Sequence, residues 1–494
     1  MPDCVGQIGG CSRAHRVILE QGPVSRMPGL SVCCYWNAIS MTQSPSATLH
    51  DLSAESMMNL SSEEEASAWS KRGNLLQKAG EFNLAISAYD RGLARFPNHI
   101  NCLCNKAQAL EQVGRRLEAL ASAQMALRLA PEHQEALLLC GTYELRLGNA
   151  VAAHACFLAV AEKGVVRNYP TAQRPARFRI LMLFSPEAGN TPYEDLINGG
   201  SFDSEVIMVL KGYRNDPDVR DPRVDVVVNL VSETDFGLDV IASAIDLADS
   251  LERPVVNHPR LILGTDRESI SRRLAHVPDT VMPATMRIEA TDLYRRVRDD
   301  AAPASPVIVR HATTHGGEMM ELVHTPEALL DFAEDAGERM LYLTDYVDYS
   351  SADGLFRKYR FLFVGDEILP YHLAIGDGWK VHHASTRMGD VEWMRLEEQA
   401  FLADPGGVFG AHGMAALDTI RRQVGLDYCG IDCGLDAQGR VVIFEVNASM
   451  LIHSDNPGFE YKTPYVLAIK AAFERLLERR ANEFRTSVGR PATV

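Results

Sequence analysis

The chain has 494 residues, and its 49 basic against 65 acidic side chains give a formal net charge of −16. A chain of this length is expected to fold into about two to four domains. With 46% hydrophobic and 23% charged residues, it is not a wholly disordered chain. The acidic balance argues against nucleic acid or an anionic membrane as a partner. No apolar run of about 18 residues is present to span a bilayer.

The cysteines and the first residues of the chain carry little pattern. Ten cysteines lack the paired spacing of a zinc site, so reduced thiols and a cytoplasmic location are expected. Residues 1–65 show neither helical nor strand periodicity, and we expect a disordered leader there. Ser61 and Ser62, followed by three glutamates, indicate that a helix begins near the end of this leader.

A period of 34 residues begins after the leader. It divides the sequence into units 66–99, 100–133 and 134–167, which predict six helices in a short solenoid. Small residues such as Gly73 and Gly141 would let paired helices approach closely. The alternative is an ordinary helical bundle. The residues that recur with the period are Gly80, Gly114 and Gly148, Pro97 and Pro131, and Ala85, Ala119 and Ala153.

The pattern changes after a proline-bearing linker at residues 165–177, and an α/β domain is predicted over 178–260. Short apolar runs alternate there with one helical stretch, which indicates a parallel sheet covered on both faces. The first turn lacks G-x-G-x-x-G, so a dinucleotide site has no support. The expected strands are Arg179–Phe184, Glu205–Leu210, Val224–Val231 and Pro254–Asn257, and the expected helix is Gly237–Leu251.

From 261 to 480 the pattern is mixed α+β, and residues 481–494 are expected to form a flexible tail. Two apolar runs in this region, Gly425–Asp436 and Arg440–Ala448, are joined by Asp436-Ala437-Gln438-Gly439. A turn of that composition between two strands predicts a β-hairpin.

The hairpin carries a candidate metal site. Glu445 and Asn447 are two residues apart and should share one strand face, whereas Phe444 and Val446 should point to the other. Asp432 on the partner strand can stand opposite the first pair. Two carboxylates and an amide oxygen are hard ligands suited to Mg²⁺ or Mn²⁺. The alternative is a solvated strand edge with unrelated acids.

Phe444-Glu445-Val446-Asn447-Ala448-Ser449, preceded by Gly430-Ile431-Asp432, resembles the metal-binding signature of the ATP-grasp ligases, which include glutathione synthetase and the ribosomal-protein glutamate ligases. The 34-residue unit resembles the tetratricopeptide repeat. These resemblances imply a multidomain chain: an all-α tetratricopeptide-repeat solenoid, an α/β pre-ATP-grasp domain and an α+β ATP-grasp domain. They also imply ATP and Mg²⁺ as cofactors. In that superfamily ATP phosphorylates a carboxylate, and an amine then displaces phosphate.

The resemblance extends to positions that contact phosphate. Arg267 and Arg310 stand where the family has lysines, and arginine can also contact phosphate oxygens. After Arg310 comes a loop with His315, Gly316 and Gly317, whose backbone N–H groups can close over phosphates. His315 is equally compatible with a structural cap.

The resemblance also indicates an adenosine site. Leu341–Asp348 is similar to the strand whose backbone meets adenine, which implicates Asp345, Tyr346 and Val347. Asp353 can approach the ribose, although turn formation explains Asp353-Gly354 equally well.

Basic side chains complete the candidate site. Strand alternation should place Lys358 and Arg360 on one face and Tyr359 on the other. Arg360, and more weakly Lys380, are the candidate catalytic cations, because cations facing the acidic cluster would offset charge on a transferring phosphoryl group. A solvated basic strand is the alternative.

Three functions remain open from the sequence. An ATP- and Mg-dependent ligase would join a carboxylate to an amine, with the repeats recruiting a protein or peptide. Arginine at both lysine positions also fits a non-catalytic nucleotide-binding adaptor. The third possibility is a kinase acting on a small hydroxyl substrate. The sequence does not identify the acid or the amine.

Overall fold

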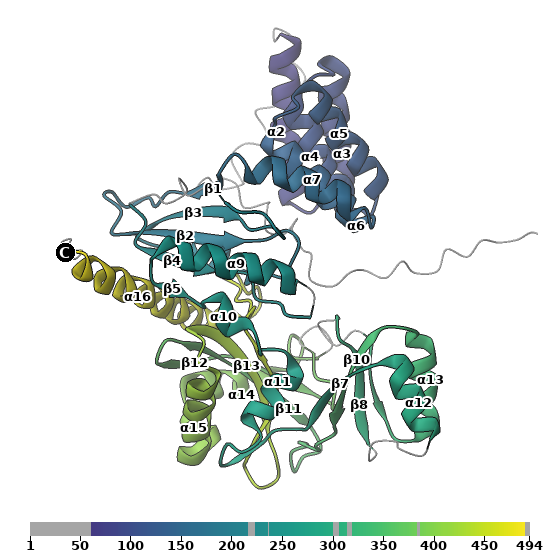
Figure 1. Cartoon of the computed structure of the whole chain (residues 1–494), viewed down its shortest axis with the longest axis vertical. Coiled ribbons are helices and arrows are strands. Elements are labelled where there is room, and N and C mark those ends of the chain that lie inside the picture. The colour runs from purple at the N-terminus through teal and green to yellow at the C-terminus, as the bar shows by residue number, and fades with distance from the viewer. Residues whose placement is uncertain are drawn as a thin grey trace, which may run out of the picture.

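The computed structural model describes residues 61–215, 223–235, 237–299, 306–313, 319–382 and 386–489. Figure 1 shows a helical region, a first sheet next to it, and two further sheets that lie side by side. Nearly all of the predicted leader lies outside the described residues. In the described part of the chain, no helix combines the length and the apolar character needed to cross a membrane.

Six helices form the N-terminal region, as the 34-residue period predicts. The first begins at Ser62, inside the predicted leader, because Ser61 and Glu64 form a capping box. The Ser61 N–H donates to Glu64 Oε2 at 2.8 Å, and the Glu64 N–H donates to Ser61 Oγ at 3.3 Å. The helices are α2 (Ser62–Lys78), α3 (Phe82–Arg95), α4 (Ile100–Gln112), α5 (Arg116–Leu129), α6 (Gln134–Arg146) and α7 (Ala150–Ala161).

Two glycines set the distance between paired helices. A Cβ atom on Gly73 would lie 2.3 Å from the ring of Tyr89, and one on Gly141 would lie 2.5 Å from the ring of Phe157. The second contact repeats the first after two periods of the sequence. The prediction that small residues permit close helix approach is therefore confirmed at both positions.

The first sheet has five strands in the order β1-β3-β2-β4-β5. Strands β2 to β5 pair in parallel as predicted, but β1 pairs antiparallel with β3. Strand β1 lies in the predicted linker, so that prediction is wrong for these residues: the segment supplies an edge strand. The strands are β1 (Val165–Tyr169), β2 (Arg179–Phe184), β3 (Asp203–Met208), β4 (Val226–Asn229) and β5 (Val255–Val256).

The helical region packs directly on this sheet. Phe157 and Val160 of α7 share an apolar cluster with Met208 and Leu210 at the end of β3. Burial of these side chains favours a fixed contact between the two regions.

Helices cover both faces of the first sheet, as predicted. Leu181 and Leu183 pack with α9 (Leu238–Leu251). Ile180 and Met182, which alternate with them, pack with α16 (Thr463–Ser487). Helix α16 extends into the predicted flexible tail, and Ala481 is buried.

The second sheet is antiparallel in the order β7-β10-β8-β9, and its core contains residues of α12 (Ala290–Arg298) and α13 (Pro326–Ala336). The third sheet has the order β12-β11-β13-β14-β6. The second sheet consists of β7 (Thr285–Glu289), β8 (Val307–His311), β9 (Met320–Val323) and β10 (Met340–Asp345). The third consists of β6 (Thr280–Val281), β11 (Phe356–Val364), β12 (Glu367–Gly376), β13 (Tyr428–Leu435) and β14 (Val441–Asn447).

Apolar side chains of the third sheet pack on both of its faces. Phe361 packs against Phe401 and Phe409, which belong to α14 (Glu392–Ala403) and α15 (Pro405–Val424). Leu362 and Tyr428 join the cluster that contains α16. Helix α16 therefore packs against both the first and the third sheet. The remaining helices are α8 (Glu194–Ile197), α10 (Pro259–Ile262), α11 (Arg267–Leu274) and the 3₁₀ turn η3 (Glu460–Lys462).

Gly73→Ala should destabilise the helical region. Tyr89 cannot move aside easily, because its hydroxyl donates to Asn74 Oδ1 at 2.7 Å and has Gln77 Oε1 as a second possible acceptor at 3.0 Å. A clash of about 1–3 kcal/mol opposes the gain of about 1 kcal/mol from replacing a helical glycine with alanine. Urea unfolding followed by circular dichroism should show a net loss in the free energy of unfolding. Lys71→Ala, at an exposed position of the same helix, should change it by less than about 0.5 kcal/mol.

Candidate active site

A cavity of about 460 Å³ is lined by residues of the second and third sheets. Strand alternation brings Lys358 and Arg360 of β11 to this cavity, while Tyr359 between them packs in the core, as predicted. The five lysine and arginine side chains in its lining are Arg267, Arg310, Lys358, Arg360 and Lys380.

The predicted hairpin places the acidic cluster in the same cavity. Asp432 of β13 pairs in register with Glu445 of β14, and Asn447 also lines the cavity. A β-bulge on β14 interrupts the alternation: Asp432 opposes Glu445, but the next residue, Cys433, opposes Ile443. Phe444 is the extra residue and lines the cavity. The prediction that Phe444 faces away is therefore wrong, whereas Val446 does lie in the core.

Asp432 is held by two cations. Its side chain is 2% exposed, and Arg360 binds both carboxylate oxygens, at 2.6 Å from Nε and 2.8 Å from Nη2. Lys358 Nζ lies 3.3 Å from Asp432 Oδ2. Burial by itself would raise the pKa of Asp432, but Arg360 and Lys358 lower it well below its usual range. The carboxylate is therefore ionised at neutral pH.

Glu445 forms an ion pair with Arg267, the first residue of α11. Burial would raise the pKa of Glu445, but Arg267 and Arg310 lower it below its usual range. Asn447 Oδ1 accepts hydrogen bonds from the N–H of Ser449 at 2.7 Å and from its hydroxyl at 2.6 Å. In this structure all three candidate metal ligands have partners within the protein.

Arg310 of β8 adds a further positive charge beside this ion pair. It is buried, and burial together with the nearby Arg267 lowers its pKa to about 10. The negative charges of Glu445 and Asp235 act on Arg310 in the opposite direction, and at pH 7 both guanidinium groups remain charged. Arg267 and Arg310 thus bring two positive charges to this part of the cavity.

The other part of the cavity is more apolar. Asp345, Tyr346 and Val347, at the end of β10, line it together with Trp379 and Val381. Tyr346 and Trp379 meet edge to face with ring centroids 6.3 Å apart. The cavity therefore offers an aromatic surface at one place and clustered cations at another.

Lys380 also lines the cavity, and its Nζ donates to the carbonyl of Met320 on β9 at 3.3 Å. Trp379, Tyr349 and His382 line the cavity too, although no sequence motif singles them out as ligands. They lie in the loops that follow β10 and β12, and this position is the signal in the sequence that could have found them. Their neighbours in space come from distant segments of the chain.

The structure does not bring Asp353 to the cavity. Its carboxylate accepts from Arg357 Nη1 at 3.0 Å, from Arg357 Nη2 at 2.9 Å and from the Leu355 N–H at 3.1 Å. These contacts fit the alternative that Asp353 is part of a turn, and its approach to a ribose stays a prediction. His315, Gly316 and Gly317 lie outside the described residues.

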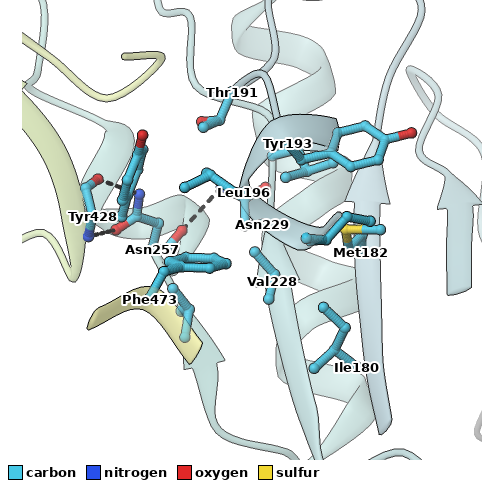
Figure 2. Close-up of a pocket in the computed structure, with 13 residues that line it drawn as sticks. Ile180, Met182, Thr191, Tyr193, Leu196, Val228, Asn229, Asn257, Tyr428 and Phe473 are labelled. Atoms are coloured by element: carbon cyan, nitrogen blue, oxygen red, sulfur yellow. Dashed lines mark hydrogen bonds between the residues drawn. The ribbon is translucent and has the colours of Figure 1, made fainter. Parts of the chain in front are cut away.

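Asn257, after β5, joins the first sheet to the strand that carries Asp432 (Figure 2). Its Nδ2 donates to the Tyr428 carbonyl at 2.6 Å, and its Oδ1 accepts from the Tyr428 N–H at 2.9 Å. Asn229 Nδ2 donates to the Asn257 carbonyl at 3.0 Å. A buried amide that makes both backbone hydrogen bonds fixes the start of β13 relative to β4 and β5.

Comparison with known proteins finds partial similarities. No family model matches the chain. Over 115 residues it is 30% identical to DnaJ homolog subfamily C member 7 of Mus musculus and 29% identical to that of Homo sapiens. Each match covers 23% of this chain and 22% of the relative. The chain thus spans about a fifth of the length of these curated relatives.

Two solved structures resemble separate parts of the chain. An ATP-grasp RimK domain protein from Sphaerobacter thermophilus DSM 20745 is 15% identical, covers 60% of this chain and 99% of its own, and has a TM-score of 0.36. The second TPR of Spaghetti (RPAP3) bound to the HSP90 peptide SRMEEVD is 28% identical, covers 20% of this chain and 91% of its own, and has a TM-score of 0.20.

Arg360→Ala should destabilise the fold most at neutral pH. The pKa of Asp432 in the folded state lies below its unfolded value, so ionisation stabilises the fold above about pH 4, and this contribution is lost as the pH falls toward the folded pKa. With only Lys358 left beside the buried carboxylate, the free energy of unfolding of the variant should be about 3 kcal/mol lower than that of the parent at pH 7. This difference in unfolding free energy should become smaller at acidic pH, because the pKa of Asp432 is higher in the variant than in the parent.

Urea unfolding at pH 7 and pH 2 measures both effects. Arg475→Ala is the matched control, because Arg475 forms an exposed pair with Glu367 and its loss should cost about 0–1 kcal/mol. A deficit of equal size at the two pH values would show that the Asp432 ion pair is not its source.

Proposed function

We propose that the chain is an ATP- and Mg²⁺-dependent ligase that activates a carboxylate as an acyl phosphate and joins it to an amine. The observation that carries this proposal is the large cavity, whose lining combines five lysine and arginine side chains with Asp432, Glu445 and Asn447. A nucleoside triphosphate has an aromatic base and a polyanionic end, and the cavity offers a complementary surface for each.

The base of ATP would lie against Tyr346, Val347 and Trp379, at the end of β10. Arg267 and Arg310 would then contact the phosphates. A triphosphate would compensate the positive charge of these two guanidinium groups. Asp345 lines the same end of the cavity.

Asp432, Glu445 and Asn447 would hold Mg²⁺ with oxygens from ATP and water. Their oxygen donors fit this ion, and the lowered pKa values keep both carboxylates ionised, as metal ligands must be. When bound, Mg²⁺ neutralises charge on the phosphates. Two carboxylates and one amide leave room for oxygens of ATP and water in the coordination of Mg²⁺.

The reaction would have two steps. The substrate carboxylate attacks the γ-phosphorus of ATP; an O–P bond forms, the bond to the bridging oxygen breaks, and ADP leaves. Arg360, Lys358 and Lys380 would stabilise charge on the transferring group. The neutral amine then attacks the acyl carbon, a C–N bond forms, the C–O bond to phosphate breaks, and inorganic phosphate leaves while the amine proton passes to solvent.

We further propose that the helical repeats recruit a protein or peptide. The first helices of the three units, α2, α4 and α6, carry a polar row: Asn105 donates to Asn74 Oδ1 at 2.9 Å, and Gln108 donates to Glu135 Oε1 at 3.0 Å. Amide and carboxylate groups in a row can hydrogen-bond to an extended peptide backbone, and stacked repeats form such concave surfaces.

A second candidate is a nucleotide-binding adaptor without turnover. The ion pairs from Arg360 to Asp432 and from Arg267 to Glu445 favour it, because a metal must compete with both guanidinium groups. Such a protein would be stabilised by ATP but would release no phosphate in the presence of any acid and amine.

Glu445→Gln tests the ligase proposal. Glutamine keeps the shape of the side chain and an oxygen acceptor for Arg267 but removes the negative charge, so the fold should survive. Phosphate release with ATP, Mg²⁺ and pools of carboxylic acids and amines should fall by about a hundredfold or more. Thermal stabilisation by Mg-ATP should fall as well.

Glu321→Gln is the control, since Glu321 is an exposed carboxylate on β9. It should keep the activity of the parent. Stabilisation of the parent by Mg-ATP without phosphate release from any pool would favour the adaptor. Full activity of Glu445→Gln would remove the proposed metal site.

A further inference from the structure

The second sheet and its helices α12 and α13 form a unit with its own core, called here the second-sheet unit (Figure 1). Its apolar cluster consists of residues from the four strands and these two helices. The first and third sheets, by contrast, share two apolar clusters. In the described part of the chain no apolar cluster joins the second-sheet unit to either of them. Polar contacts and the connecting segments must therefore set its position, as in domains that move against each other.

One of these polar contacts comes from the loop after β4. Asp235 Oδ1 accepts from the Tyr342 hydroxyl at 2.7 Å and lies 3.5 Å from Arg287 Nη2. Tyr342 is fully buried, and the side chain of Asp235 is 9% exposed. A hydrogen bond to a carboxylate at this depth is stronger than one at the surface, so the contact favours one fixed position of the second-sheet unit.

The loop that carries Asp235 is itself fixed to the first sheet. The Ser232 N–H donates to the Gly189 carbonyl at 3.0 Å, and Asn190 and Val231 form an isolated β-bridge. The helix that follows the loop, α9, packs on the first sheet. Asp235 therefore connects the second-sheet unit to a rigid support.

The same contact reaches the proposed phosphate site through the strand register. Tyr342 of β10 lies opposite Arg287 of β7 and opposite Arg310 of β8. Directly opposed residues share one face of a sheet and are close neighbours on it. Arg310 lines the large cavity, whereas Tyr342 and Asp235 lie outside its lining. A shift of Tyr342 would therefore move Arg310 relative to Glu445 of the third sheet.

We propose that Asp235 is a positioning residue, which holds the second-sheet unit where Arg310 faces the phosphates of ATP. This inference rests on the ATP site proposed above and adds to it a residue from the loop of the first sheet. Without the Asp235 contact the unit would occupy this position for a smaller fraction of the time. The apparent affinity for ATP falls with that fraction.

Two variants remove the contact from opposite sides: Tyr342→Phe lacks the hydroxyl, and Asp235→Ala lacks the carboxylate. Stopped flow measures how fast the full chain releases a fluorescent N-methylanthraniloyl derivative of ATP that is bound with Mg²⁺. Each variant should release this nucleotide about tenfold faster than the parent, because a hydrogen bond to a buried carboxylate is lost. The double variant should release it at about the rate of the single ones, because both changes act on one contact.

Hydrogen exchange without nucleotide separates a displacement of the unit from a loss of its structure. The Thr285 N–H donates to Ser271 Oγ of α11 at 3.1 Å, across the boundary of the second-sheet unit. This amide should exchange faster in both variants, whereas amides within β8 and β10 should keep the rates of the parent. Faster exchange throughout β8 and β10 would show unfolding of the unit and would overturn the proposal.

Two other variants of the second-sheet unit are matched controls. Tyr294→Phe removes a hydroxyl from α12, and Asp331→Ala removes an exposed carboxylate from α13. Both should match the parent in nucleotide release and in exchange at Thr285. Parent-like values in both Asp235→Ala and Tyr342→Phe, or additive effects in the double variant, would overturn the proposal.

The two measurements also separate this proposal from the ligase function. If the parent binds the nucleotide and the variants release it at the parent rate, Asp235 does not position the unit, while the ligase function stands. If the parent binds no nucleotide, the ligase function fails, and exchange at Thr285 decides whether Asp235 holds the unit in place.

Discussion

The arrangement of the candidate site depends on one buried ion pair. Arg360 and Asp432 are register partners on β11 and β13 at the centre of the third sheet, and the guanidinium binds both carboxylate oxygens. An ion pair at this depth is maintained only if each charge keeps its partner, because an uncompensated buried charge costs several kcal/mol. The pair therefore fixes the rotamers of both side chains at the floor of the large cavity and leaves Lys358 oriented toward the same carboxylate.

The position of this floor relative to the first sheet is set by two distant segments. Helix α16 packs against both sheets, and Asn257 makes two hydrogen bonds to the backbone of Tyr428 at the start of β13. The first contact is apolar and non-directional, whereas the second specifies a register. Together they hold the loop after β4 next to the end of β14.

Sequence patterns predicted the features that depend on local periodicity. The 34-residue period, the alternation at Lys358 and Arg360, and the hairpin that pairs Asp432 with Glu445 all appear in the structure. The features that depend on distant contacts were not predictable. The bulge at Phe444, the second cover of the first sheet by α16 and the pairing of β1 with β3 each need a partner from another segment. A single segment carries no signal for such a partner.

The Arg267–Glu445 pair separates a basic cavity from an acidic one. The basic one is the large cavity, lined by Arg310, Lys358, Arg360 and Lys380; the acidic one has a volume of about 50 Å³ and is lined by Glu233, Asp235 and Asp266. A phosphate that bound Arg267 would compete with Glu445 for the same guanidinium and so would free carboxylate oxygens for a metal ion. The two kinds of ligand would therefore assist each other across this pair, because each compensates the partner that the other takes away. A chain with like charge in both cavities would lack this coupling.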